Sequence, residues 1–131
     1  MPSTVIEVRR PYTPAEEILL IDAVQSALVE AFKLPATDRT VRLVVHEPHR
    51  FACSPKLQNP ERATEITIDC FTGRTLGAKR ALYTAIVRNL EPLGIPPVCV
   101  KIKLHEIGQE NWGISGGRAA CDVDLGFVVE V

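Results

Sequence analysis

The sequence predicts an α+β fold in which two βαβ repeats form a four-stranded mixed sheet with two helices on one face. The first observation is the order of the patterns, because a strand, a helix and a strand occur in succession and then occur again. The second is a repeat in the letters, since RLVVHE at 42–47 resembles KIKLHE at 101–106. Two crossovers of this kind place both helices against one sheet.

The first repeat is expected over about 2–47. Its strand pattern is the alternation of apolar and polar residues that follows Pro2. Thr13 and Glu16 match a capping box around Pro14, so a helix should begin there and end before Leu34-Pro35. The predicted elements are a strand over 4–9, a helix over 14–32 and a strand over 41–46.

The second repeat is expected over about 63–106, after a polar connecting loop over about 48–62. Thr75 is the expected cap of its helix, and the prolines and the glycine at 92–97 close that helix. The predicted elements are a strand over 64–71, a helix over 76–91, a strand over 98–105, a glycine-rich hairpin segment over 107–131 and, within it, a final strand over 125–131.

One face of this sheet is left without a cover, because the sequence holds no third layer. Its residues are expected to include Val5, Leu43 or Val44, and Ile66 or Ile68. Self-association is the simplest way to cover such a face, and we therefore expect an oligomer.

Composition and charge restrict the function classes. The chain has 131 residues, of which 46% are apolar and 24% charged, and its formal net charge is −1. These values are ordinary for one globular domain and do not indicate binding to nucleic acid or to an anionic membrane. No apolar run approaches the ~18 residues that span a bilayer, and no signal-peptide pattern is seen. We therefore expect a cytoplasmic protein.

The cysteines and histidines do not predict a metal centre. The four cysteines, at 53, 70, 99 and 121, form no CxxC pair and are expected to be reduced. A zinc site could be imagined from His46, Glu47, His49 and Cys53. However, the neighbours His46 and Glu47 would point to opposite faces of a strand. No metal is therefore predicted.

Pro2 has two possible roles. Proline is tolerated at the start of a strand because it lacks an N–H, which gives it a purely structural role. Alternatively, removal of Met1 leaves the Pro2 nitrogen as a free amine anchored beside a sheet.

Four features together resemble the tautomerase superfamily: Pro2 before a strand, the Gly73-Arg74-Thr75 turn before a helix, the doubled βαβ plan, and NWGISGG at 111–117. The resemblance implies the tautomerase (MIF-like) fold, a homotrimer and no cofactor. The subgroup most similar is malonate semialdehyde decarboxylase, through AFKLP at 31–35, Asp38-Arg39 and KRALY at 79–83. The chain departs from that subgroup at Thr72, where the subgroup has a further arginine.

The resemblance also implies roles for individual residues. Pro2 would be a general base and Arg74 would hold a carboxylate of a small 2-oxo or 2-hydroxydienoate acid. Asp38 would activate water in a decarboxylating or hydrating relative, although aspartate is also common in turns. The residues that could line the site are Trp112, Phe127, Tyr12 and Arg9, each of which could equally serve packing or charge.

Three functions remain open from the sequence. The first is keto–enol tautomerisation with Pro2 as base. The second is cofactor-independent decarboxylation or hydration of a β-keto acid such as malonate semialdehyde. The third, from another class, is a non-catalytic trimer that binds a small acid or a protein.

Overall fold

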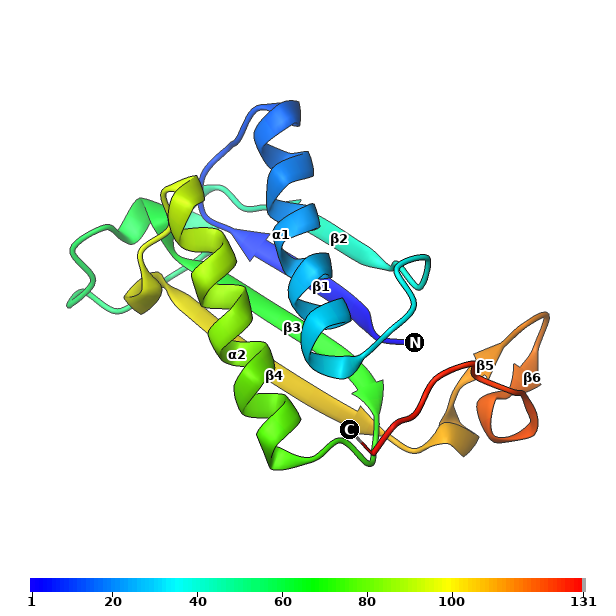
Figure 1. Cartoon of the computed structure of the whole chain (residues 1–131). Helices are drawn as coiled ribbons and strands as arrows, with labels where there is room; N and C mark the ends of the chain where they lie inside the picture. Colours follow the sequence, from blue (N-terminus) through cyan, green and yellow to red (C-terminus); the bar gives the residue numbers. More distant parts are fainter. Residues whose placement is uncertain (131) are drawn as a thin grey trace.

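The computed structural model describes residues 1–130, and it contains a four-stranded mixed sheet with two helices on one face (Figure 1). The strand order is β2-β1-β3-β4, in which β1 and β2 are parallel, β1 and β3 antiparallel, and β3 and β4 parallel. The main elements are β1 (Ser3–Val8), α1 (Pro14–Phe32), β2 (Val41–Val45), β3 (Thr64–Phe71), α2 (Leu76–Leu90) and β4 (Val100–Ile107). The predicted fold class is confirmed.

Short elements fill the connections. A small hairpin, β5 (Gly113–Ile114) and β6 (Arg118–Ala119), follows β4. Within residues 1–130, six single-turn 3₁₀ helices were not predicted, because so short a turn has no periodic pattern in a sequence. They span Pro48–Arg50, Pro60–Arg62, Glu91–Leu93, Pro97–Cys99, Gln109–Asn111 and Ala120–Asp122.

Threonine side chains begin both long helices. In α1 the Thr13 hydroxyl accepts a hydrogen bond from the Glu16 N–H at 3.2 Å, and the Glu16 carboxylate accepts one from the Thr13 N–H at 2.9 Å. This is the predicted capping box, which satisfies two N–H groups that the helix leaves free. In α2 the Thr75 hydroxyl accepts from the Ala78 N–H at 3.0 Å.

The hydrophobic core lies between the sheet and the two helices. In β1 and β3 the alternate residues point toward the helices, so that Ile6 and Ile66, which are paired across the strands, are both fully buried. Leu28 of α1 and Leu82 of α2 cover them from the helical layer. Each such side chain contributes roughly 1.5–3 kcal/mol through removal from water.

The opposite face of the sheet is more polar than the sequence suggested. Val5 and Val44 lie there as expected, but Leu43, Ile66 and Ile68 face the helices instead. The open face carries polar side-chain pairs, His46–Glu7 at 2.9 Å, His105–Asp69 at 3.0 Å and Lys103–Glu65 at 3.1 Å. The alternation of strand residues was correctly recognised, but its phase could not be assigned in runs such as LVV, where apolar residues are consecutive.

Strand directions bring distant segments together at one end of the sheet. Ser3 at the start of β1 pairs with Asp69 near the end of β3, which in turn pairs with His105 near the end of β4. The N-terminus, the turn at 72–75 and the C-terminal segment therefore meet at this end (Figure 1). The loop at 47–62 projects at the other end.

The C-terminal segment differs from its prediction. Residues 125–130 form no strand, and Val131 lies outside the described residues. Gly126 has a φ of 75° and donates its N–H to the Asp124 carboxylate at 3.0 Å, which makes a turn where the predicted strand would continue. The alternation around Phe127 instead reflects side chains that pack on the end of the sheet.

Within residues 1–130, no helix combines the length and the apolar character that crossing a bilayer requires.

Candidate active site

The N-terminus lies beside Asp38 at the end of the sheet where β1 starts. The α-amino nitrogen of Met1 is 3.4 Å from an Asp38 carboxylate oxygen, and the Asp38 side chain is only 12% exposed. Pro2 itself is buried. The loop that carries Asp38 is fixed by its backbone, because the Asp38 N–H donates to the Pro35 carbonyl and the Gln25 amide donates to the Asp38 carbonyl.

Burial lowers the pKa of the terminal amine below its ordinary value. The Asp38 carboxylate opposes this effect because it favours the ammonium form, whereas the positive charge of Arg74 adds to it. A terminal amine at this place therefore has more of its neutral, basic form at a given pH than an exposed one.

Arg74 approaches the same place from the turn between β3 and α2. Gly73 precedes it with a φ of 128°, a backbone conformation that favours glycine. The side chain is only 7% exposed, and its guanidinium lies 4.5 Å from the Phe32 ring centroid and 5.5 Å from that of Phe127. Burial lowers the pKa of Arg74, while Cys70, Glu130 and Asp38 favour its charged form. An arginine stays protonated in proteins even so, and the site therefore holds a fixed positive charge.

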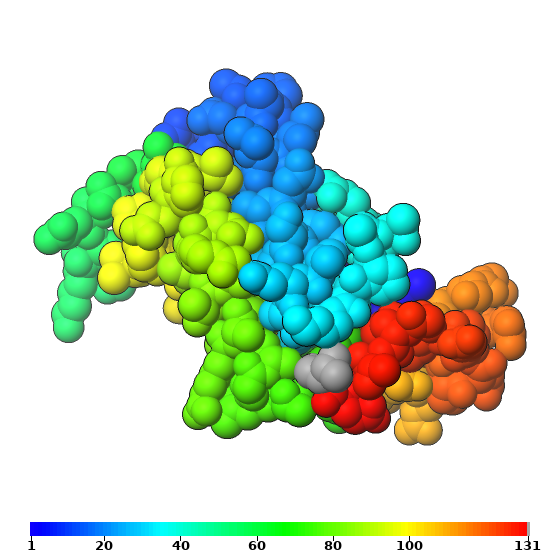
Figure 2. All heavy atoms as spheres, in the orientation of Figure 1, coloured from blue at the N-terminus to red at the C-terminus, as the bar shows by residue number. Residues whose placement is uncertain are grey.

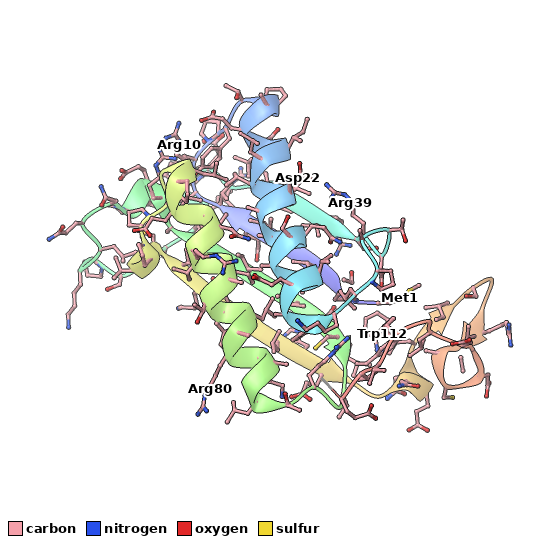
Figure 3. The ribbon with its side chains drawn as sticks, viewed as in Figure 1. Met1, Arg10, Asp22, Arg39, Arg80 and Trp112 are labelled. Carbon is pink, nitrogen blue, oxygen red and sulfur yellow. The ribbon has the colours of Figure 1, made fainter. Side chains whose placement is uncertain are left out.

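Aromatic side chains form one wall of this region. Phe71, the last residue of β3, makes an edge contact with Trp112 at 5.1 Å and stacks on Phe127 at 6.4 Å between ring centroids. The Trp112 indole donates to the Ile107 carbonyl at 3.1 Å, which fixes the ring. Met1 and Trp112 lie at the same end of the molecule in Figure 3.

Tyr12 and Arg9 lie at the opposite end of β1. The Tyr12 hydroxyl accepts from Arg62 at 3.2 Å, and the Arg9 side chain donates to the Phe51 carbonyl at 2.7 Å. A six-residue strand places them roughly 20 Å from the N-terminus, and Figure 3 shows Arg10 and Met1 at opposite ends. Within one chain they do not meet Pro2 and Arg74, so their role in a site stays a prediction that requires a neighbouring subunit.

Several contact residues were not predicted. Phe32, Phe71 and Val128 touch Arg74 or its aromatic neighbours, and Gln25 holds the Asp38 loop. Phe71 could have been noticed because it breaks the alternation of β3, where Cys70 and Phe71 are consecutive buried residues. The hydrogen bonds to Phe32 and Val128 are accepted by backbone carbonyl groups, which a sequence pattern does not indicate.

Other places in the molecule were considered for a site. A groove of about 630 Å³ lies between α1 and α2, but its floor is mostly small side chains, and none of the predicted site residues lines it. Cys53 and His46 do not share a metal site, since no three His, Cys, Asp or Glu side chains in residues 1–130 come together as ligands. The end of the sheet is therefore the best candidate, because ionisable groups and an aromatic wall gather there.

Comparison with known proteins identifies the family. A family model described as tautomerase enzyme matches residues 38–115, which is more than half of the chain. The chain is also 38% identical over 48 residues to a 2-hydroxymuconate tautomerase of Comamonas testosteroni, covering 36% of this chain and 76% of that protein. This chain belongs to the tautomerase superfamily, as the sequence resemblance suggested.

Solved structures agree with this assignment. Malonate semialdehyde decarboxylase superposes with a TM-score of 0.82 at 25% identity, covering 93% of this chain and 99% of that one. A second malonate semialdehyde decarboxylase, inhibited by 3-bromopropiolate, gives 0.76 at 28% identity and covers 89% and 92% of the two chains. A native fused 4-OT gives 0.82 at 21% identity, with 92% and 98% covered, which shows the shared fold. The chain is thus a tautomerase-superfamily enzyme whose structural neighbours include decarboxylases.

Proposed function

We propose that this protein is a cofactor-independent tautomerase that uses Pro2, after removal of Met1, as a general base on small 2-oxo or 2-hydroxydienoate acids. The observation that carries the proposal is the meeting of the Met1 α-amino group, which directly precedes Pro2, with Asp38 and Arg74 at one end of the sheet. The family assignment and the similarity to a 2-hydroxymuconate tautomerase support it.

In the proposed reaction, the neutral Pro2 nitrogen takes the hydroxyl proton of the dienol and returns a proton to carbon, which gives the keto acid. Arg74 binds the carboxylate of the substrate, because a guanidinium forms paired hydrogen bonds with a planar carboxylate. The aromatic side chains of Phe71, Trp112 and Phe127 keep water away from the amine, which favours its neutral form.

A direct experiment is to measure ketonisation of 2-hydroxymuconate and of phenylenolpyruvate by the wild type and by Pro2→Ala. General-base catalysis typically contributes about 10²–10⁴-fold in rate, and we expect Pro2→Ala to lose a factor of this size. Pro11→Ala is the matched control, since Pro11 lies in the exposed turn before α1. Equal turnover by Pro2→Ala and the wild type would exclude Pro2 as the base.

Decarboxylation or hydration of a β-keto acid is the second candidate. It is favoured by Asp38, whose nearly buried carboxylate lies beside the N-terminus, and by the similarity to malonate semialdehyde decarboxylases. Thr72, which stands where that subgroup has an arginine, argues for the tautomerase. Release of carbon dioxide from malonate semialdehyde, lost in Asp38→Asn, would support the second candidate.

A non-catalytic binding protein is the alternative from another class. It predicts an intact Met1 and no turnover of any of these compounds, together with retained binding of small carboxylates. Measuring binding and turnover on the same preparation separates this alternative from both enzymes.

We also propose a homotrimer. Fused 4-OT proteins of the same fold are described as asymmetric and symmetric trimers. In this chain the face of the sheet opposite the helices carries Val5 and Val44 among polar side-chain pairs, and contact between subunits would cover these two valines. Light scattering coupled to size exclusion should give three times the monomer mass of 14.4 kDa.

A further inference from the structure

We propose that residues 125–130, here named the C-terminal strap, position the Arg74 guanidinium so that its Nε edge faces the substrate carboxylate. The proposal rests on the proposed function only in taking Arg74 as the group that binds a carboxylate. Phe127 and the carbonyl of Val128 are positioning groups in this account, and Arg74 is the group that touches the ligand.

The hydrogen bonds of Arg74 distinguish the edges of its guanidinium. Nη1 donates to the Phe32 carbonyl at 2.6 Å and to the Val128 carbonyl at 3.3 Å. An Nη nitrogen carries two N–H groups, so both donors of Nη1 are occupied. The Nε–H is buried and has no hydrogen-bond partner among residues 1–130.

A buried donor without a partner is rare in folded proteins, and it often marks the place of a ligand. The Nε and Nη2 groups together form one of the two-donor edges that match a carboxylate. Because Nη1 is held by carbonyls, the Nε–Nη2 edge is the one left for a substrate.

Two rings and two carbonyls hold this orientation. The Phe32 ring and carbonyl come from α1, whereas the Phe127 ring and the Val128 carbonyl come from the C-terminal strap. Two of the four groups that orient Arg74 therefore belong to α1, and the other two belong to a segment without regular secondary structure.

The C-terminal strap is itself anchored beside Arg74. Val129 is only 6% exposed and packs with Phe71 and Ala120. A Cβ on Gly73 would lie 3.1 Å from the Val129 side chain, so the turn that carries Arg74 and the strap touch directly. Figure 1 shows the strap returning from the β5–β6 hairpin to the end of β3, and Figure 2 shows it on the surface of the molecule.

The test measures binding of phenylacetate and of phenylacetamide by calorimetry. The two ligands share the phenyl group, but only phenylacetate carries a carboxylate, so an effect that acts through Arg74 is confined to phenylacetate. Loss of a charged hydrogen bond weakens binding by about 10- to 100-fold, and we expect this loss for phenylacetate in Phe127→Ala. Val98→Ala is the control, because its side chain is exposed and it lies just before β4, at the opposite end of the sheet from Arg74.

A double-mutant cycle with Arg74→Ala identifies the route of the effect. If Phe127 acts through Arg74, Phe127→Ala weakens phenylacetate binding less than about twofold in the Arg74→Ala background. Phe127→Leu and a chain ending at Leu125 give two further variants, in case Phe127→Ala does not fold. Circular dichroism verifies the fold of each variant.

Three results would overturn the proposal. They are unchanged phenylacetate binding in Phe127→Ala, an equal loss for phenylacetate and phenylacetamide, and no binding of phenylacetate by the wild type. Failure of the proposed function gives a different pattern. In that case either Pro2→Ala keeps full turnover or the wild type has no turnover, but Phe127→Ala still weakens phenylacetate binding.

Discussion

Replacement of Asp38 by asparagine should move the activity of this protein to lower pH. In the chain that keeps Met1, the Met1 α-amino nitrogen lies 3.4 Å from an Asp38 carboxylate oxygen, and Asp38 is the largest influence that raises the pKa of this amine against the burial that lowers it. Removal of Met1 makes the next residue, Pro2, the terminal amine, and we expect Asp38 to act on the pKa of that amine in the same direction. Without the carboxylate charge, burial and Arg74 are opposed by the smaller effect of Cys70, so the amine should lose its proton at lower pH. The neutral amine is the proposed base, and the rising limb of kcat/KM should follow it.

The size of the effect follows from the exposure of the pair. The Met1 side chain is 49% exposed and the Asp38 side chain 12% exposed, so the pair lies at the edge of the molecule, neither fully screened nor fully buried. Exposed ion pairs contribute up to about 1 kcal/mol. This energy corresponds to an increase of about fivefold in the acid dissociation constant of the amine.

The assay is kcat/KM for phenylenolpyruvate between pH 4.5 and about 9, the range in which an α-amino group with a lowered pKa titrates. Asp22→Asn is the matched control, because Asp22 pairs with Arg39 on the exposed surface of α1. An unchanged rising limb, or one that moves to higher pH in Asp38→Asn, would refute the reasoning.

Further predictions concern the Arg74 turn and the helix cap. Arg74→Ala should lower kcat/KM for carboxylate substrates by about 10- to 100-fold. Arg74→Lys should keep only part of the wild-type kcat/KM, because lysine lacks the two-donor edge of a guanidinium. A kcat/KM above half of the wild-type value in Arg74→Ala would contradict this prediction. Gly73→Ala should destabilise the fold by about 1–3 kcal/mol in urea unfolding, since φ is 128° and Val129 is close. In α2, a Cβ at Gly77 would make only an ordinary contact of 3.8 Å with the Thr75 hydroxyl, so Gly77→Ala should instead stabilise by about 0.5–1 kcal/mol. Equal effects at the two glycines would be inconsistent with this account. Thr13→Ala should cost about 1 kcal/mol through loss of the cap of α1, whereas an unchanged unfolding midpoint would show that the capping box is not stabilising.

The elements of the fold were predictable because their signals are local. Thr13, Glu16 and Pro14 define the start of α1 by chemistry that acts within one turn, and the alternation of β3 was read with both bounds correct. The prediction of a strand over 125–131 was wrong for residues 125–130. Alternation indicates which side chains are buried. It does not record whether a neighbouring strand is available for backbone pairing.

The candidate site was predictable in part, and for a different reason. Pro2, Arg74 and Asp38 were selected by resemblance to a family, and the structure brings their region together through strand pairing over long sequence separations. Tyr12 occupies the position in the first repeat that Arg74 occupies in the second, and the same reasoning placed it in a site. The two turns lie at opposite ends of the sheet, because β1 and β3 run antiparallel. Whether two strands pair in parallel or antiparallel depends on the whole fold, and the sequence of one segment does not predict it.

The most direct test of the central claim is mass spectrometry of the N-terminal peptide after incubation with 3-bromopropiolate near neutral pH. A malonate semialdehyde decarboxylase of the same fold has been crystallised with this inhibitor. A free and largely neutral Pro2 amine predicts a peptide that lacks Met1 and carries one adduct on the Pro2 nitrogen. A peptide that keeps Met1 and carries no adduct, from protein that still catalyses ketonisation, would contradict the account.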